Sequence, residues 1–385
     1  MKHIKSVQLK GITWNHSRGF TSMVATAQRF CELNPGVEIV WEKRSLQAFA
    51  DEPIDQLAER YDFLIIDHPW AGFAGKHRVI LPLDQYLPKE FMADLAENTV
   101  GYSHISYSSE GHQWALAVDA ATPVASSRPD IFKDKELRLP ETFADLLHLA
   151  KKGWVAMPGI PQDTLMNFYM MCCTLGEDVC TGKEEVVSED IGIQALQLLR
   201  ELAMEINDQV FNWNPIKVYE AMTCTDNFAY CPWAYGYTNY SRRGYARQLL
   251  HFHDMVNIKG MGRAISTLGG TGLAVSAKCG AVETAMKYVE YVGSETCQKT
   301  VFFDGGGQPG HRKVWLDERA NVATHNFFKN TISALDRAFL RPRYNGHMYF
   351  QDRAGAPIRE YLMNGGNEWK LLQDLNELYR KSLDQ

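Results

Sequence analysis

The chain has 385 residues, a hydrophobic fraction of 45% and a formal net charge of −6. This length exceeds what one compact core usually fills, so we expect two or three domains. The mild negative charge, with no long Lys/Arg block, argues against a phosphate-binding face and therefore against nucleic acid as a partner. No apolar run approaches the roughly 20 residues that span a bilayer, so we expect no direct membrane insertion.

The N-terminal residues and the cysteines bear on the cellular compartment. Met1–Lys5 leads directly into a strand-like run, without the apolar segment of a secretory signal. The eight cysteines are scattered without a disulfide framework or a Cys-x-x-Cys motif, as is more usual in a reducing compartment. Two interpretations stay open: a cytoplasmic protein if Met1 is the native start, or a periplasmic protein if a signal was trimmed.

The first third of the chain alternates strands and helices. Apolar spacing predicts strands at 6–14, 37–41 and 61–66 and helices at 20–33, 53–60 and 89–97. This β-α-β-α-β order predicts a parallel sheet, with ligand-facing loops after the carboxyl ends of its strands.

The remaining two thirds have the same α/β character. We predict strands at 111–118, 124–127 and 154–157, a segment approaching another strand at 222–230, an aromatic loop at 231–240 and a flexible loop at 304–310. Helices are predicted at 140–152, 163–175, 189–206, 281–293, 321–328 and 367–382. No solenoid repeat and no low-complexity linker occurs, so any domains must be joined by chain crossings rather than by a tether.

The segment Ser266–Ala277 contains three closely spaced glycines, at 269, 270 and 272, followed at once by a short apolar strand. Glycine lets a backbone approach a ligand or another chain closely. The spacing is not that of a dinucleotide-binding fingerprint, and the strand follows the glycines instead of preceding them. We interpret the segment as a crossing between two lobes, which bends when the lobes close and forms part of a cleft floor.

Polar and aromatic loops fall at comparable places in the α/β units. We predict ligand-binding residues among Trp14, Asn15, His16, Arg18, Asp67, His68, Trp70, Asp119, Trp233, Tyr235, Tyr237, Gly270, Thr271, Gln308, His311 and Arg312. Aromatic faces with a few polar groups suit a sugar, whereas the forks of Arg18, Arg312 or Arg343 would suit a carboxylate. Structural roles stay open, because Trp14 and Trp70 fit a core and Asp119 fits a turn.

The familiar catalytic motifs are absent. The chain has no His-Glu-x-x-His, Gly-x-Ser-x-Gly or Gly-Lys-Ser/Thr sequence. His251, His253 and Asp254 lack a fourth ligand, so we predict no metal site and no cofactor. The sequence favours a binding protein without catalytic residues over an enzyme. If the chain is instead a cytoplasmic enzyme or ligand sensor, Asp67, His68 and Asp119 are the acid/base candidates.

Several segments resemble one known family in the order in which they occur. Phe30–Ile39 (FCELNPGVEI), Tyr61–Asp67 (YDFLIID), Leu81–Leu87 (LPLDQYL) and Gly269–Ser276 (GGTGLAVS) are similar to segments of the extracellular solute-binding proteins, family 1, of carbohydrate ABC transporters. The helix at Ala285–Val292, with Gln298 after it, is similar to the segment that follows in that family. These similarities fall within residues 1–310.

The resemblance implies an α/β type II periplasmic-binding fold, with two lobes around a central cleft joined by crossing strands. Lobe I would be 1–118 plus 270–318, and lobe II 119–269 plus 319–385, with crossings near 113–127, 266–277 and 305–320. The implied ligand is a sugar, an oligosaccharide or an acidic sugar derivative, held by hinge closure of the lobes. The implied partner is the permease of an ABC importer, and we expect the protein itself to be a monomer.

Overall fold

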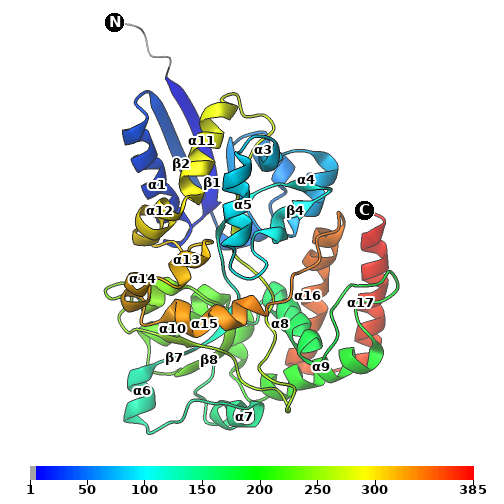
Figure 1. The fold of residues 1–385 in the computed structure, drawn as a ribbon. Helices are drawn as coiled ribbons and strands as arrows, with labels where there is room; N and C mark the ends of the chain where they lie inside the picture. Colours follow the sequence, from blue (N-terminus) through cyan, green and yellow to red (C-terminus); the bar gives the residue numbers. More distant parts are fainter. Residues whose placement is uncertain (1–5) are drawn as a thin grey trace, which may run out of the picture. The chain divides into compact units, whose positions relative to one another are not determined.

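The computed structural model describes residues 6–385, and the chain divides into two compact units (Figure 1). Unit 1 contains the chain up to Ala121, Gly269–Val322 and Arg343–Asn345. Unit 2 contains Thr122–Leu268, Ala323–Pro342 and Gly346–Gln385. The sequence placed the corresponding boundaries after residues 118, 269 and 318, and did not anticipate the short third segment of unit 1.

Unit 1 is built on a five-stranded sheet with the order β2-β1-β3-β10-β6. β1 runs parallel to β2 and β3, as the β-α-β order predicts, whereas β10 is antiparallel to both β3 and β6. The strands are β1 (Val7–Trp14), β2 (Val37–Arg44), β3 (Phe63–Ile66), β6 (Leu116–Asp119) and β10 (Thr271–Val275), with a small separate pair of β4 (Ser108–Ser109) and β5 (His112–Gln113).

The helices of this part of the chain connect and cover these strands. They are α1 (Phe20–Leu33), α2 (Leu46–Asp51), α3 (Ile54–Ala58), α4 (Trp70–His77), α5 (Lys89–Glu97), α11 (Val282–Gly293), α12 (Glu295–Cys297), α13 (Arg312–Trp315) and α14 (Glu318–Ala323). The predicted strand at 111–118 is thus divided between β5 and β6. The predicted helices at 20–33, 89–97 and 281–293 are confirmed.

The core of unit 1 is formed by the apolar face of α1, by α11 and by the sheet. Met23, Ala27 and Phe30 recur at helical spacing on α1 and are buried. Tyr288 of α11 packs edge-on against Phe30, with ring centroids 5.3 Å apart. Its buried hydroxyl lies 2.8 Å from the Thr26 hydroxyl and accepts a hydrogen bond of 3.2 Å from an indole N–H, which avoids the penalty of an unsatisfied polar group, about 1–3 kcal/mol.

The glycine-rich segment enters the unit 1 sheet as β10. Gly270 has φ of +92°, and a Cβ at this position would lie 2.4 Å from the carbonyl oxygen of Asp119. The neighbouring Gly269 N–H donates to the Ala121 carbonyl at 2.8 Å. Only glycine satisfies both the left-handed backbone and this close approach. Gly270 therefore fixes how β10 packs beside the end of β6.

Unit 2 contains a three-stranded antiparallel sheet with the order β8-β7-β9. Its strands are β7 (Pro123–Ser127), β8 (Tyr230–Tyr235) and β9 (His251–His253). Its helices are α6 (Pro129–Asp134), α7 (Phe143–Lys151), α8 (Pro161–Thr174), α9 (Glu189–Ala203), α10 (Pro215–Cys224), α15 (Phe327–Asp336), α16 (His347–Asn364) and α17 (Glu368–Leu383).

Helices α8 and α16 pack very closely in unit 2. A Cβ at Gly355 of α16 would lie 2.0 Å from the carbonyl oxygen of Pro161 at the start of α8. The Thr164 hydroxyl also donates to the Gly355 carbonyl at 3.1 Å. Gly355 is therefore required for the contact between the two helices.

One prediction around β8 is confirmed in part and another is wrong. Residues 222–230 lead into β8, which begins at Tyr230, but the first three of them still belong to α10, which continues to Cys224. The predicted aromatic loop at 231–240 begins as strand β8, which includes Pro232. Proline is tolerated there because β8 lies at the edge of its sheet, where a missing N–H breaks no ladder.

Three other predictions are corrected by the structure. In the predicted strand at 154–157 only Val155 pairs, through a single bridge to Tyr230. The predicted helix at 321–328 is the end of α14 and the beginning of α15, with a turn between them. Helix α16 was not predicted, since Gly355 and Pro357 near its middle resemble helix breakers.

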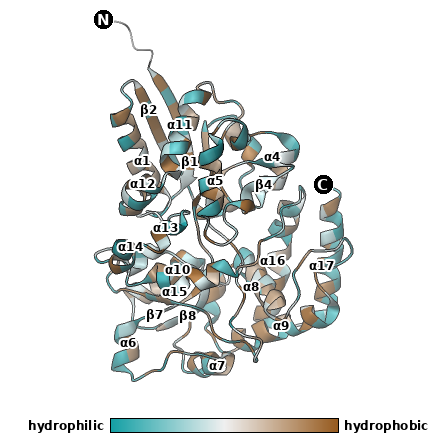
Figure 2. Cartoon of the chain, in the orientation of Figure 1, coloured by the Kyte–Doolittle hydropathy of each residue, from teal (hydrophilic) through white to brown (hydrophobic). Residues whose placement is uncertain are grey.

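The outer helices of the described chain are amphipathic. In Figure 2, α17 carries both hydrophilic and hydrophobic residues, and its buried positions recur at helical spacing. Within residues 6–385 no helix is both long and apolar enough to cross a bilayer. All eight cysteines are free thiols.

Candidate functional site

One edge of the unit 1 sheet gathers half of the predicted site residues. Trp14 ends β1, Asp67 follows β3 directly, Asp119 ends β6 and Thr271 begins β10. Because β10 is antiparallel to β3 and β6, its first residue lies at the same edge as their last residues. We call Trp14, Arg18, Asp67, His68, Trp70, Asp119, Thr271 and Gln308 the edge cluster.

A buried ion pair lies in the edge cluster. Arg18 Nε donates to Asp119 Oδ2 at 2.8 Å, and Nη2 donates to Oδ1. The side chains of Arg18 and Asp119 are only 4% and 1% exposed. The backbone N–H of Gln308 also hydrogen-bonds the carboxylate. Burial raises the pKa of Asp119, and the arginine opposes that rise.

Gln308 forms hydrogen bonds to the backbone just after the end of β6. Its side-chain amide donates to the Ala120 carbonyl at 2.8 Å, and its own carbonyl accepts from the Ala120 N–H at 3.1 Å. These bonds fix the backbone immediately after Asp119. The Asp119 carboxylate is thus engaged by neighbours within unit 1 rather than presented as a general base.

Two of the three histidines of the predicted site, His16 and His68, are half-buried and fully buried, respectively. Burial, and secondly the charge of Arg18, lower the pKa of His16 to about 3, so its ring is neutral at physiological pH. His16 Nδ1 accepts a hydrogen bond of 3.0 Å from the Arg18 N–H. His68 is fully buried, with its ring edge-on to Tyr107, and its Nδ1 lies 3.5 Å from Asp67 Oδ1. The Asp67 and His68 side chains approach each other, although adjacent residues usually point apart.

Three polar atoms of the edge cluster are buried without a hydrogen-bond partner. They are the indole Nε1 atoms of Trp14 and Trp70 and the hydroxyl of Thr271. Trp14 also belongs to the core, because it packs on Phe49 with ring centroids 5.4 Å apart. Buried polar groups are normally paired, so three unsatisfied groups at one sheet edge suit a polar ligand.

Three further predicted site residues lie outside the edge cluster. Asn15 is exposed, and its backbone N–H donates to the Arg44 carbonyl at 2.7 Å. His311 caps the first turn of α13, where its Nδ1 accepts from the Lys313 N–H at 3.4 Å. The Arg312 backbone N–H donates to the Asn98 carbonyl at 2.7 Å.

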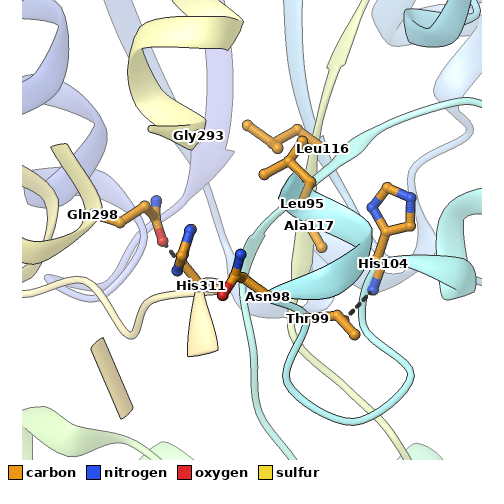
Figure 3. A pocket seen from close by; sticks show the side chains of 10 residues that line it. Leu95, Asn98, Thr99, His104, Leu116, Ala117, Gly293, Gln298 and His311 are labelled. Atoms are coloured by element: carbon orange, nitrogen blue, oxygen red, sulfur yellow. Dashed lines mark hydrogen bonds between the residues drawn. The ribbon is translucent and has the colours of Figure 1, made fainter. Parts of the chain in front are cut away.

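His311 also lines a small cavity inside unit 1 (Figure 3). The lining residues are Leu95, Asn98, Thr99, His104, Leu116, Ala117, Gly293, Gln298, Gly310 and His311. The cavity volume of about 10 Å³ suits one water molecule and is far too small for a sugar.

The aromatic residues predicted for the second lobe lie on or after β8 in unit 2. Trp233 is fully buried, and its indole Nε1 has no hydrogen-bond partner. The Tyr235 hydroxyl lies 3.1 Å from that of Thr267. Tyr237 is 4% exposed and packs edge-on against Tyr219.

Two polar residues of α8 were missed by the sequence reasoning. Asp163 Oδ2 and Asn167 Nδ2 are both buried without a hydrogen-bond partner. Burial raises the pKa of Asp163 to about 8. The sequence does single out Asp163, because it is the only charged residue in α8. An acidic residue in the first turn of a helix is usually explained by its interaction with the helix dipole, so Asp163 did not stand out as a candidate.

Nothing among residues 6–385 groups three or more His, Cys, Asp or Glu side chains as a metal site would. The side chains of His253 and Asp254, which the sequence offered as part of a weak metal site, contact other residues instead. His253 Nε2 lies 2.8 Å from the Ser127 hydroxyl, and Asp254 forms an ion pair with Arg337.

These features belong to the α/β type II periplasmic-binding fold that the sequence predicted, and comparison with solved structures confirms the fold. Maltose-bound MalE3 of T. maritima superposes with a TM-score of 0.84 at 15% identity, covering 98% of this chain and 100% of that chain. A ribitol complex of an ABC transporter solute-binding protein from Agrobacterium radiobacter K84 gives a TM-score of 0.82 at 17% identity, covering 99% and 100%. A Thermotoga lettingae solute-binding protein with α-D-tagatose gives 0.82 at 15% identity, covering 98% and 100%.

Searches at the level of sequence add no further relative. No protein-family model matches the chain, and no curated protein matches it. At 15–17% identity the solved structures establish a shared fold.

Proposed function

We propose that this chain is the solute-binding protein of an ABC importer and captures a sugar or a polyol. The observation that carries the proposal is the similarity, over almost the full chain, to solute-binding proteins that hold maltose, ribitol and tagatose. A ligand of that kind presents hydroxyl groups and apolar C–H faces, which polar side chains and aromatic rings recognise together.

The edge cluster of unit 1 offers groups of this kind. We propose that Trp14, Trp70 and Thr271 contact the ligand, because each carries a buried polar atom without a partner. We further propose Asp67 and His68 as polar contacts, since they immediately follow β3 at the same sheet edge. A ligand hydroxyl can both donate and accept, so it can pair with indole, hydroxyl and carboxylate groups alike.

The arginines support a neutral ligand over an acidic one. Arg18 is held in its buried pair with Asp119. Arg343 Nη1 donates to the carbonyls of Ile105 at 2.7 Å and Ser108 at 2.6 Å. An acidic sugar needs a cationic fork facing it, and these two arginines serve contacts within unit 1.

Delivery of a solute to an importer implies a cellular location for the protein and a macromolecular partner. We propose that it acts on the side of the membrane from which the importer takes up its solute, and that its macromolecular partner is the permease. A monomer suffices for this role, since every proposed contact residue belongs to one chain.

A thermal-shift panel tests the proposal. Maltose, ribitol, mannitol and tagatose are added to the purified chain, and binding of one of them stabilises the folded state by about 2.7 kcal/mol at 100 times its Kd. Trp70→Phe removes the unpaired N–H and reduces the shift, whereas Trp369→Phe, at an indole on a 51% exposed residue of α17, leaves it unchanged. A panel in which no sugar or polyol raises the melting temperature would contradict the proposal.

A further inference from the structure

A second cavity of unit 1 lies apart from the edge cluster, and its size suits a small molecule. Its volume is about 470 Å³, within the range of roughly 300–1,000 Å³ that is usual for ligand sites. It is bordered by the end of α4, the turn that joins β4 to β5 and the segment 343–345, all within unit 1. Its lining includes Lys76, Arg78, Ser109, Glu110, Arg343 and Asn345, and we call it the α4 cavity.

The walls of the α4 cavity are held together by close packing on α4. Gly72 and Gly75 are three residues apart on this helix and therefore share one face. A Cβ at Gly72 would clash with the Arg343 carbonyl oxygen. A Cβ at Gly75 would lie 2.9 Å from Glu110 Cγ. The segment 343–345 and the β4–β5 turn thus both contact α4 where the helix carries no side chain, which fixes two walls of the cavity.

The guanidinium of Arg343 is anchored on one side only. Its Nη1 donates to the carbonyls of Ile105 and Ser108 at 2.7 and 2.6 Å. Within residues 6–385, no hydrogen bond or ion pair involves its Nε or Nη2. These two atoms form the edge of a guanidinium that binds an oxyanion through two parallel hydrogen bonds. The anchored side chain therefore offers a preorganised edge to a carboxylate or a phosphate.

The α4 cavity carries more positive than negative charge. Lys76, Arg78 and Arg343 line it against a single carboxylate, that of Glu110. Lys76 and Arg78 are exposed, and neither forms an ion pair within the described part of the chain. The helix dipole accounts for cations at the end of α4, but not for Arg343, which comes from a distant segment. This local excess of cations also runs against the formal net charge of −6 of the whole chain.

We propose that the α4 cavity binds a phosphate group, either as the free ion or as part of a small phosphate monoester. At pH 7 such a group carries a charge of about −1.5 to −2 and three acceptor oxygens, which suit the excess of positive charge in the cavity. Arg343 can hold two of these oxygens, while Lys76 and Arg78 supply further positive charge. No edge-cluster residue lines the cavity, so this site is additional to the proposed solute site and independent of it.

Other small ligands match the α4 cavity less well. A cation would meet three positive charges and a single carboxylate. A monocarboxylate has two oxygens and one charge, so it would use the edge of Arg343 and leave Lys76 and Arg78 without a counter-charge. The cavity volume leaves room for an organic group beyond the phosphate, so the test compares both forms of phosphate.

Calorimetric titration of the full chain at pH 7 tests the site. The probes are inorganic phosphate, glycerol 3-phosphate and acetate, each at the same ionic strength, because salt screens exposed charges. The test variant is Lys76→Gln/Arg78→Asn, since asparagine tolerates the φ of +51° at position 78. The matched control is Lys10→Gln/Lys89→Gln, which removes two exposed lysines of unit 1 that lie outside the cavity. Circular dichroism melts confirm that both variants are folded.

The expected result is saturable binding of one phosphate probe per chain, with weaker binding of acetate. The test variant should weaken phosphate binding by about 10-fold, because each exposed charge pair contributes a factor of up to roughly five, and the control should not. Tighter binding of glycerol 3-phosphate would support a monoester as the ligand, and tighter binding of inorganic phosphate would support the free ion.

Three results would overturn the phosphate site. They are the absence of saturable binding of either phosphate probe at millimolar concentration, acetate binding as tight as phosphate binding, and equal phosphate affinities in the test variant and the control. None of these results bears on sugar or polyol binding at the edge cluster, so the proposed function is tested separately.

Discussion

The buried Arg18–Asp119 pair makes the sharpest stability prediction. Asp119→Ala removes the carboxylate that accepts two hydrogen bonds from the guanidinium. Arg18 then keeps its charge, because an arginine side chain does not lose its proton in proteins. Its side chain is only 4% exposed, so water cannot replace the lost partner without rearrangement of the sheet edge.

The magnitude follows from that burial. Breaking a buried pair by removing one member costs about 3–5 kcal/mol, because an uncompensated charge remains. Folded proteins are stable by only about 5–15 kcal/mol in total, so Asp119→Ala should destabilise the chain severely. Removing both charges in Arg18→Met/Asp119→Leu should recover most of the loss, since the desolvation penalty disappears with the pair.

Urea unfolding at pH 7, followed by tryptophan fluorescence and by circular dichroism, measures the effect. Two probes are needed, because a chain of two units can unfold in more than one step. The control is Glu32→Ala, which breaks an exposed pair with Arg29 whose side chains are 50% and 47% exposed. It should leave the unfolding midpoint essentially unchanged.

Two results would refute this reasoning. One is an Asp119→Ala effect below about 1 kcal/mol, the value typical of a solvated surface pair. The other is a double variant no more stable than Asp119→Ala, which would show that the lost stability comes from packing and not from the unpaired charge.

Three further predictions concern other parts of the chain. Gly270→Ala should destabilise unit 1 by about 1–3 kcal/mol or more, because the backbone at this position is left-handed and the added Cβ would lie against the Asp119 carbonyl. The control is Gly280→Ala, since the space around a Cβ at that position is open. Equal melting temperatures for the two variants would contradict the packing at Gly270. Ellman's reagent should react fastest with the exposed Cys224, more slowly with the half-buried Cys31 and Cys180, and with the five buried thiols only after unfolding. More than three thiols reacting in the folded protein would contradict the burial of those five. The pKa of Asp163 rises from about 4 in the unfolded chain to about 8 in the folded one, so its contribution to the stability of the folded state is complete below pH 4 and is lost as pH rises to 8. Asp163→Asn should therefore raise the melting temperature at pH 8 more than at pH 4. A change in melting temperature that is independent of pH would contradict this assignment.

The elements of unit 1 could largely be predicted from the sequence because their patterns are local. Helix α1 shows helical spacing of apolar residues and ends at Leu33, where the side-chain amide of the following Asn34 donates to the Phe30 carbonyl at 2.8 Å. Strand β3 is a continuous apolar run, as expected of a strand buried on both faces. Neither element depends on distant parts of the chain for its identity.

The wrong predictions occurred where distant contacts override local preference. Strand β8 contains Pro232, which suggests a loop until its place at a sheet edge is known. Helix α16 contains Gly355 and Pro357, yet its packing against α8 requires the glycine. Local rules assign both segments to irregular structure, and tertiary contacts reverse that assignment.

The candidate site was only partly accessible to sequence reasoning. Strand-end positions pointed to Trp14, Asp67 and Trp70, because the ends of parallel strands are recognisable in sequence. The Arg18–Asp119 pair joins residues 101 positions apart, and no local pattern indicates that partnership. The partnerless state of Asp163 is likewise a property of its packed surroundings, so it emerges only from three-dimensional structure.

Calorimetric titration of the unaltered chain with maltose, ribitol, mannitol and tagatose tests the central claim most directly. We predict saturable binding of at least one of them, with one ligand per chain and a dissociation constant near micromolar, about −8 kcal/mol. The absence of saturable heat for all four compounds at millimolar concentration, in a protein shown by its melting curve to be folded, would contradict the assignment as a sugar- or polyol-binding protein.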